Sequence, residues 1–262
     1  MKLNDVRTLV HLTRGNELRF DELTFREIRE CADAGWLAIL PTGCTEQQGP
    51  HLPVNFDTWF VEAVCLAAMK QAAEKYDVKG LVLPAMPFGP TPEHRNYGSG
   101  YVHIPQALHE GLVEAVLNSL AEQGFERIIV WRGCGQHTLG DVVERFNRAH
   151  TDQARAYLPS LPYAEIMQQF APGVPGGHAD SFSTSISLHL RPQAVRVDRI
   201  PEPESKPVDW SNPNLDFTLY SQSGVIGDPT QASADLGAKL WYTIVETVAL
   251  TFRETAKTRK TA

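Results

Sequence analysis

The chain has 262 residues, of which 42% are hydrophobic and 21% charged, and its formal net charge is −7. This composition is typical of a globular protein, and the length fits one large α/β domain better than two small ones. The acidic balance and the lack of a basic block argue against a nucleic-acid partner. No apolar run approaches the roughly 18 residues of a membrane-spanning helix. Four cysteines without CxxC spacing favour the reducing cytoplasm.

Helices and strands are predicted to alternate along the chain. Thr24 and Glu27 form a capping-box pattern that begins a helix, and Gly35 ends it. Short apolar runs predict buried strands at residues 37–40, 80–84 and 127–131, with a β-like piece at 156–158. Apolar residues at helical spacing predict helices at 57–76, 105–122, 163–170, 181–190 and 232–253. We therefore predict a single α/β domain over residues 1–262, with a mainly parallel sheet flanked by helices on both faces and with about 20 N-terminal and 8 C-terminal residues peripheral.

Residues able to carry chemistry gather in the loops after these strands. Right-handed crossovers place the loops that follow Leu40, Pro84 and Trp131 at one edge of the sheet, where ligands of α/β proteins bind. The candidates in these loops and in a fourth, Gly-rich one are Glu46, Gln48, Asp57, Glu93, His94, His103, Cys134, Gln136, His137, His178 and Asp180.

The candidate set allows more than one chemistry. Carboxylates with His or Cys ligands are suited to Zn²⁺ or Mn²⁺ and to activating a water molecule. A metal-free pocket that binds a polar small molecule through amides and histidines is the alternative. Cys134 as a nucleophile, with His137 or His178 as its base, is a third arrangement.

Several of these residue types also have purely structural interpretations. Asp57 stands just before a predicted helix, so it is a candidate N-cap as well as a candidate ligand. His51, between two prolines, is expected to bond loop backbone. Cys44 and Cys65 are expected to be buried packing residues, and His109 a packing or surface residue on a helix.

The first loop resembles the signature of the creatininase (creatinine amidohydrolase) family. Residues 40–58 read LPTGCTEQQGPHLPVNFDT, which is similar to the family pattern PxGSxEQHGPHLPxxxD. Weaker matches follow in order, namely Glu93-His94, the turn RGCGQH after the third strand, GGHA with TS in 176–185, and GVIGDP at 224–229. The resemblance covers roughly residues 24–253, and on it the chain is identified as a member of the family.

Membership implies an α/β sandwich with a dinuclear metal centre that hydrolyses cyclic or linear amides, usually in a homo-oligomer and commonly a hexamer. Glu46 matches a metal ligand of the family, Asp57 matches the carboxylate that bridges the two metals, and His178 matches the catalytic histidine. The bridging arrangement would stabilise the attacking hydroxide and the developing oxyanion.

Other ligand positions of the family are replaced here. Gln48 stands where the family has a histidine, Cys134 stands at another histidine position, and Gln136 stands where a glutamate ligand can sit. Ser181 and Ser183 replace two further glutamates. Amides and hydroxyls are weak ligands for Zn²⁺ or Mn²⁺. We therefore expect one divalent metal at most, held by Glu46, Asp57 and Cys134 with His137 or Asp180 as substitute ligands, and the second family metal lost.

Two hypotheses of function follow. The first is a divergent hydrolase that opens a small polar cyclic substrate, either a cyclic amide or a cyclic ketone. In it Glu46 and His178 are catalytic, and Arg132 binds a carboxylate or polarises a carbonyl. The substrate-binding residues expected beside them are Gln48, His94, Gln136 and His137. The second hypothesis is a catalytically inactive relative that serves as a ligand-binding or assembly subunit. The first requires that Glu46 and Asp57 approach one another across the first loop.

Overall fold

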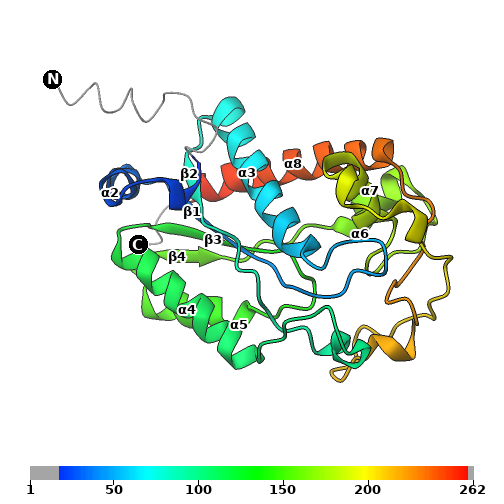
Figure 1. Ribbon diagram of the computed structural model, residues 1–262. Coiled ribbons are helices and arrows are strands. Elements are labelled where there is room, and N and C mark those ends of the chain that lie inside the picture. The colour runs from blue at the N-terminus through cyan, green and yellow to red at the C-terminus, as the bar shows by residue number, and fades with distance from the viewer. Residues whose placement is uncertain (1–17, 259–262) are drawn as a thin grey trace.

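The computed structural model describes residues 18–258, which form a four-stranded parallel sheet with helices on both faces (Figure 1). The strands are β1 (Leu37–Thr42), β2 (Gly80–Val82), β3 (Arg127–Arg132) and β4 (Arg155–Tyr157). Their order is β2-β1-β3-β4, so β1 and β3 are the central strands. In this register Leu37 pairs with Gly80, and Ala38 pairs with Ile128. The predicted fold class is confirmed.

The sheet is apolar because both of its faces are covered. All six residues of β1 are buried, and alternate side chains enter different cores. Ala38 and Leu40 face one core, whereas Leu37 and Ile39 face the other. A strand with this double burial reads as a continuous apolar run, which is why β1 was recognisable from its sequence.

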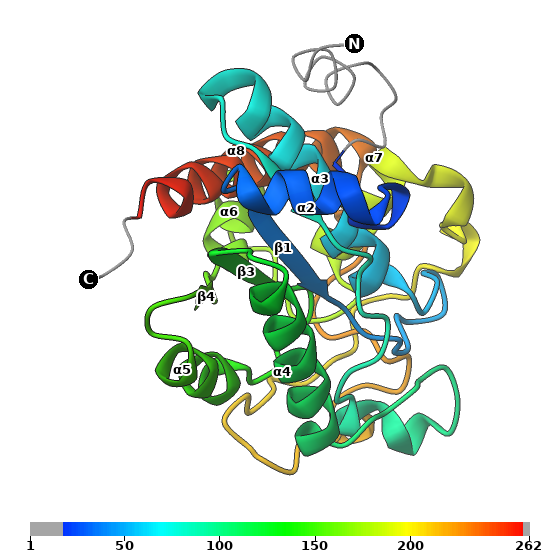
Figure 2. The ribbon, with the colours of Figure 1, turned by 90° about the vertical axis from the view of Figure 1, so that its left-hand side faces the viewer.

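Two helices cover the first face of the sheet, α4 (Gln106–Glu122) and α5 (Gly140–Ala149) (Figure 2), and α2 (Phe25–Asp33) contributes Cys31 and Ala32 to the same core. Leu117 of α4 and Phe146 of α5 pack against this face. Helix α2 begins at the predicted capping box, since Glu27 Oε2 accepts a hydrogen bond from the Thr24 amide at 2.7 Å. Gly35, in the left-handed region at φ 75°, follows its end.

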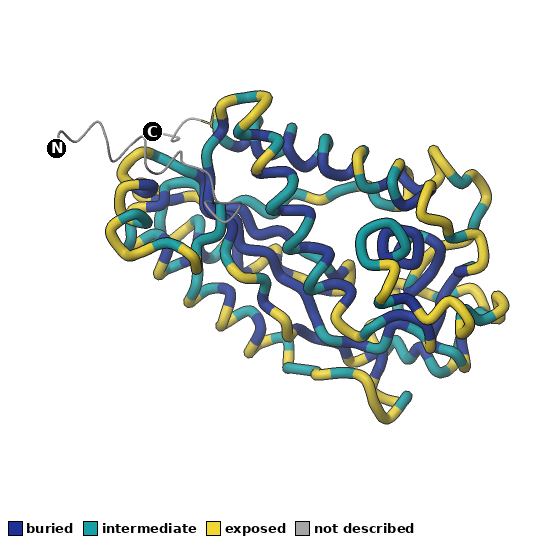
Figure 3. The backbone as a smooth tube through the Cα atoms, turned by 45° about the horizontal axis from the view of Figure 1, so that its top comes forward, coloured by how far each residue is buried: buried dark blue, intermediate teal, exposed yellow. Residues whose placement is uncertain are grey.

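The second face is covered by α3 (Phe56–Tyr76), α6 (Tyr163–Phe170), α7 (Ser181–Leu190) and α8 (Ala234–Lys257). The long helices α3 and α8 lie side by side along the sheet (Figures 1 and 2). Gly237 of α8 sits directly against the Ser185 carbonyl of α7, where a Cβ would overlap it. The buried stretches of Figure 3 follow the strands and the inner sides of these helices.

Irregular chain with short 3-10 turns makes up the rest. These turns are η1 (Phe20–Glu22), η2 (Pro92–Tyr97), η3 (Pro192–Ala194), η4 (Val197–Arg199) and η5 (Phe217–Leu219). Strand β2 ends two residues earlier than predicted. Within residues 18–258 no helix is long and apolar enough to cross a membrane. Most of the N-terminal segment predicted to be peripheral lies outside the described residues.

Candidate active site

The loops after β1, β2 and β3 meet a fourth loop at the carboxyl edge of the sheet, as predicted from the crossovers. Together with the first turns of α3 and α7 they enclose a cavity of about 190 Å³. Its lining includes the polar residues Glu46, Gln48, Asp57, Glu93, His94, Gln136, His178 and Ser183. Six aromatic side chains line it too, namely Phe56, Phe60, Tyr163, Phe182, Trp210 and Phe217, and Cys134, Ala179 and three glycines complete the lining.

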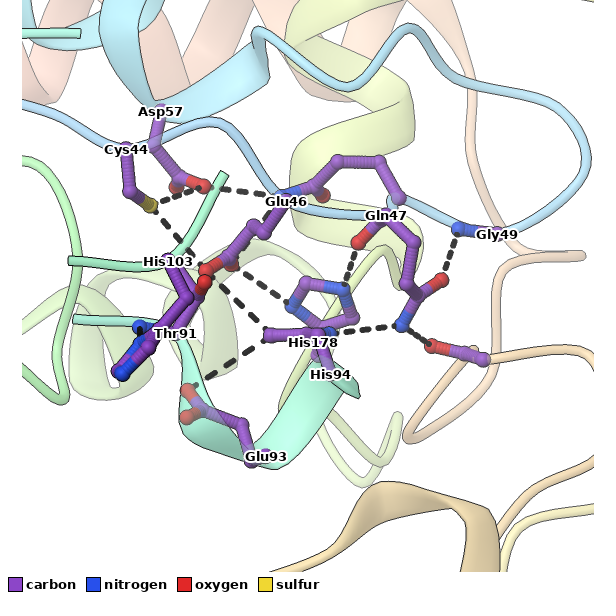
Figure 4. Close-up of polar contacts among 12 residues, drawn as sticks. Cys44, Glu46, Gln47, Gly49, Asp57, Thr91, Glu93, His94, His103 and His178 are labelled. Atoms are coloured by element: carbon purple, nitrogen blue, oxygen red, sulfur yellow. Dashed lines mark hydrogen bonds and ion pairs between the residues drawn. The ribbon is translucent and has the colours of Figure 1, made fainter. Parts of the chain in front are cut away.

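Glu46 lies among four other side chains at this cavity (Figure 4). Its carboxylate is 3.4 Å from His94 Nε2 and 3.5 Å from His178 Nδ1. Cys44 Sγ lies 3.1 Å away on the same side as Asp57. Only 3% of Glu46 is exposed, so its charged form is desolvated, and the hydrogen bonds from its neighbours offset only part of that cost.

Asp57 approaches Glu46 across the first loop, as the hydrolase hypothesis requires. Gln48 Nε2 donates to Asp57 Oδ2 at 2.9 Å and lies 3.4 Å from Glu46 Oε1, so one amide joins the two carboxylates. The N-cap interpretation of Asp57 is wrong. Asn55 is the residue that precedes α3, and Asp57 lies in the first turn with its carboxylate turned to Gln48 and Cys44.

The amide of Gln47 determines which nitrogen of His94 carries the proton. Gln47 Oε1 accepts from the Gly49 amide at 2.9 Å, so Gln47 Nε2 is the donor to His94 Nδ1 at 3.0 Å and to the Gly224 carbonyl. His94 Nδ1 is therefore an acceptor, and the proton of the neutral ring sits on Nε2, which faces Glu46. His94 Nε2 lies 3.4 Å from the carboxylate of Glu46 and 3.7 Å from that of Glu93.

His178 has the opposite arrangement. Its Nε2 lies 2.7 Å from the Gln47 carbonyl, an acceptor, so the proton sits on Nε2 and the Nδ1 lone pair faces Glu46. The next residue but one, Asp180, accepts from the amides of Gly177, Phe182 and Ser183 and caps α7. Asp180 is thus a helix cap, and its prediction as a substitute metal ligand is wrong.

Glu46, Asp57, His94 and His178 form the acid–base cluster of the site. Burial shifts the pKa of each of them. It raises the pKa of Glu46 to about 7, and it raises the pKa of Asp57 well above its ordinary value, with the charge of Glu46 adding to the effect. Burial also lowers the pKa of His94 to about 4 and that of His178 well below 6.5. Both histidines are therefore neutral at pH 7, and the two carboxylates share a strong preference for a proton.

Cys44, like Gln47, is a site residue that was not among the sequence-based candidates. It was expected to be a packing residue, and it is fully buried, but its Sγ lies 3.1 Å from Glu46 Oε2 and 3.4 Å from Asp57 Oδ2. The available signal was its position two residues before Glu46, just beyond the end of β1. Because Cys44 is so close to Glu46 in the first loop, its side chain can reach the same site as the Glu46 carboxylate.

Two predicted substrate contacts are not at the cavity. Arg132 Nη1 donates to the His137 carbonyl at 2.7 Å and fastens the loop after β3. Neither Arg132 nor His137 lines the cavity, because His137 is turned into the interior beside His109. Gln136 does line it and is exposed, and His94 and Gln48 line it as well. The predictions for Arg132 and His137 are therefore corrected.

Other predicted histidine roles also change. His51 Nε2 pairs with Thr184 Oγ1 at 2.8 Å, so it links the first loop to α7 rather than bonding loop backbone. His103 Nδ1 accepts from the Thr91 amide at 2.9 Å, which closes the loop after β2. Both residues shape the loops around the cavity without lining it.

In the part of the chain that the structure describes, three groups of side chains have donor atoms that lie within 4.8 Å of one another, close enough to surround a metal ion. The groups are Cys44 with Glu46 and Asp57, Glu46 with His94 and His178, and Cys44 with Cys134 and His137. In the second group His94 presents an N–H to Glu46, which is the wrong tautomer for a ligand. Cys134 is grouped with His137, not with the carboxylates as expected.

The first of these groups fits one family metal. Cys44, Glu46 and Asp57 offer a thiolate and two carboxylates, a donor set suited to Zn²⁺. Gln48 directs an N–H, not a lone pair, at Asp57, the carboxylate that would have to bridge two ions.

The fold and the cavity define an α/β protein with an acid–base cluster and metal-ligating groups at the carboxyl ends of its strands. The family model "Creatininase: Creatinine amidohydrolase" matches residues 21–251. The chain belongs to the creatininase family.

Named relatives differ in what they act on. The chain is 30% identical over 220 residues to the mycofactocin precursor peptide peptidase of Mycobacterium ulcerans, covering 80% of this chain and 82% of the relative. It is 27% identical over 256 residues to the creatinine amidohydrolase of Pseudomonas putida, covering 89% and 95%. It is also 27% identical over 256 residues to the 3-dehydro-scyllo-inosose hydrolase of Thermotoga maritima, covering 86% and 79%.

Solved creatininases share the fold. One described as "Creatininase Mn" superposes with a TM-score of 0.79 at 23% identity, over 92% of this chain and 99% of the other. A mutant creatininase described as "Zn-Zn type" superposes with a TM-score of 0.80 at the same identity and coverage.

Proposed function

We propose that this protein is a hydrolase that opens the ring of a small, planar, polar cyclic amide. The observation that carries the proposal is the placement of the Glu46 carboxylate between a donor, His94 Nε2, and an acceptor, His178 Nδ1, at a cavity of about 190 Å³. A neutral base and a buried carboxyl group within reach of one another are the parts that acid–base hydrolysis needs.

The cavity wall supports a planar substrate without negative charge. Six aromatic side chains line it and offer flat surfaces for a ring to stack on. Its titratable lining residues are acids, histidines, Cys134 and Tyr163, with neither Lys nor Arg among them. A planar cyclic amide, neutral or cationic, matches this wall better than the puckered ring of a cyclic ketone. The relative from Pseudomonas putida, named for the hydrolysis of creatinine, supports the same class.

The chain's own residues supply the proton transfers. His178 Nδ1 accepts a proton from a water molecule while its Nε2–H remains bonded to the Gln47 carbonyl. The water oxygen forms a bond to the amide carbon, the ring C–N bond breaks, and the same proton passes from His178 to the departing nitrogen. The N–H groups of His94 and Gln48 stabilise the negative charge that Glu46 and Asp57 carry during these transfers.

One divalent metal ion, Zn²⁺ or Mn²⁺, would be held by Glu46 and Asp57 with Cys44 and would supply polarisation of the substrate carbonyl. This set replaces the predicted one, because Cys44 takes the place expected for Cys134. The second metal of the family is absent from the proposal, since Gln48 donates where a ligand is needed.

Turnover of defined compounds tests the proposal. Metal-loaded protein is incubated with creatinine, hydantoin, dihydrouracil, an inosose and a short peptide, and the gain of one water is followed by mass spectrometry. We expect a cyclic amide to be opened, with kcat lowered by about 10²–10⁴-fold in His178→Asn. His150→Asn, at the end of α5, is the control that should retain activity. Binding of a cyclic amide without turnover would contradict the proposal and favour an inactive binding subunit.

We also propose that the chain forms a homo-oligomer, as a hexamer by family resemblance, in the cytoplasm. Leu108 and Leu112, one turn apart on α4, are 60% and 47% exposed and offer an apolar strip for a second copy. All four cysteines are free, which is typical of a reducing compartment. Light scattering coupled to size-exclusion chromatography measures the assembly, and a monomer at micromolar concentration would overturn it.

A further inference from the structure

Beside the acid–base cluster lies a second set of metal-binding atoms, which shares only Cys44 with the set of the proposed hydrolase. Cys44 Sγ, Cys134 Sγ and a ring nitrogen of His137 lie within 4.8 Å of one another, and all three residues are buried. Two thiols and an imidazole form a softer donor set than the carboxylates of Glu46 and Asp57.

The histidine of this set is buried, with 0% of the residue exposed. Neither ring nitrogen of His137 has a hydrogen bond of normal geometry, and the backbone of Pro90 is the polar group that interacts with the ring. An unpaired buried polar group of this kind destabilises a fold, so such a group in a native protein commonly has a water molecule, an ion or a functional role as its explanation. His94 and His178, in contrast, each have one ring nitrogen bonded to Gln47. Among the histidines of the three candidate metal sets in the described residues, His137 is the one whose two ring nitrogens both lack such a bond.

The local backbone holds His137 and Cys134 on the same side of the loop. The His137 amide bonds back to the Cys134 carbonyl at 3.4 Å, which closes a turn, and Arg132 grips the His137 carbonyl at 2.7 Å. The His137 ring lies directly on Gly89, where a Cβ would overlap it. On its other side stands His109, 4.7 Å away between ring centroids, whose ring nitrogens are also unpaired. The ring is therefore fixed in place before any ion arrives.

We propose that Cys44, Cys134 and His137 form a binding site for one thiophilic metal ion, with Zn²⁺ as the expected occupant. Binding replaces the two thiol protons by two metal–sulfur bonds and releases both protons to solvent. Two cysteines and one histidine leave the fourth position of a tetrahedral ion for water or another ligand. Because Cys44 also belongs to the set with Glu46 and Asp57, an ion in either set competes for the same sulfur.

Cobalt provides a spectroscopic probe of this site that is independent of hydrolysis. Reduced, chelator-treated full-length protein is titrated with Co²⁺ without oxygen, and the thiolate-to-cobalt charge-transfer absorption is recorded. We expect about one Co²⁺ per chain with the intensity of two thiolates, and displacement by Zn²⁺. Cys44→Ala, Cys134→Ala and His137→Phe should each weaken binding at least tenfold.

Matched variants show whether the ion binds the set with Cys134 and His137 or the set with Glu46 and Asp57. Cys31→Ala, at a buried cysteine of α2, should leave the absorption unchanged. Asp57→Asn should also retain it, because this carboxylate is not part of the proposed set. Loss of the band in Asp57→Asn together with full retention in His137→Phe would place the ion among the carboxylates and overturn the proposal.

X-ray absorption at the zinc edge of wild-type protein removes any dependence on variants that fold poorly. Two sulfur neighbours at about 2.3 Å and one imidazole would support the site. One sulfur with oxygen neighbours, or no bound zinc, would overturn it. Neither measurement requires a substrate, so failure of the proposed hydrolysis and failure of this site are distinguishable.

Discussion

Gln47 sets the tautomer of His94. The Gln47 amide nitrogen lies 3.0 Å from His94 Nδ1, and its oxygen is held by the Gly49 amide, so the direction of the bond is determined. Through its backbone carbonyl, the same residue also holds His178 Nε2 at 2.7 Å. One residue between the two histidines thus orients both toward Glu46. Gln47 lies in the first loop, next to Gln48, which stands where the family has a histidine.

Gln47→Glu is expected to reverse that tautomer. A carboxylate at this position accepts a proton, so His94 would protonate Nδ1 and turn a lone pair on Nε2 toward Glu46. We expect kcat to fall by about 10–100-fold with little change in KM, as for other residues that orient a catalytic group. Nitrogen NMR of labelled histidine reports the tautomer directly. Gln123→Glu, at the exposed end of α4, is the control, and an unchanged His94 tautomer in Gln47→Glu would contradict the prediction.

Glu46→Gln is expected to change how stability depends on pH. Burial raises the pKa of Glu46 from 4.5 to about 7, so the folded chain binds this proton more tightly than the unfolded chain. Wild-type stability therefore falls as pH rises from 4.5 to about 7, and the loss persists above that window. The variant has no titrating group at this position, so it does not lose this stability. Its free energy of unfolding relative to wild type should therefore rise by up to about 3 kcal/mol between pH 4.5 and about 7.

Urea unfolding of metal-free protein at several pH values measures this gain. The exposed variant Glu144→Gln on α5 corrects for the removal of one negative charge. A stability difference between Glu46→Gln and wild type that stays flat from pH 4.5 to 8 would contradict the assigned burial effect.

Alanine substitutions at two helical glycines are expected to have opposite effects on stability. A Cβ on Gly237 would overlap the Ser185 carbonyl, so Gly237→Ala should separate α8 from α7 and destabilise the fold by about 1–3 kcal/mol. Gly111 on α4 has nothing near its would-be Cβ, so Gly111→Ala should stabilise by up to about 1 kcal/mol through helix propensity. Thermal unfolding of both variants checks the pair. Equal effects would show that the α7–α8 contact is not tight.

Metal content is expected to be one ion per chain. The carboxylate set and the thiolate set share Cys44, and Gln48 donates an N–H where the family needs a second set of ligands. Elemental mass spectrometry of protein purified without chelators or a histidine tag, then exposed to Zn²⁺ and Mn²⁺, gives the ratio. Two ions per chain would contradict the loss of the second family metal.

The sequence alone determined the architecture. Doubly buried strands such as β1 read as unbroken apolar runs, and the Thr24–Glu27 capping box marks the start of α2 through local hydrogen bonds. These signals arise from residues that are close in sequence, so they can be recognised without the tertiary structure. Right-handed crossovers then placed the loops at one edge, and Glu46 and Asp57 at one site.

Only the tertiary structure decided what the side chains touch. Cys44 and Cys134 are 90 positions apart, and packing of the loops after β1 and β3 is what brings their sulfur atoms together with His137. Arg132 bonds the His137 carbonyl instead of lining the cavity, and Asn55, not Asp57, is the residue that precedes α3. Such choices depend on the burial of each group and on which distant donor satisfies it, and neither is written in the local sequence.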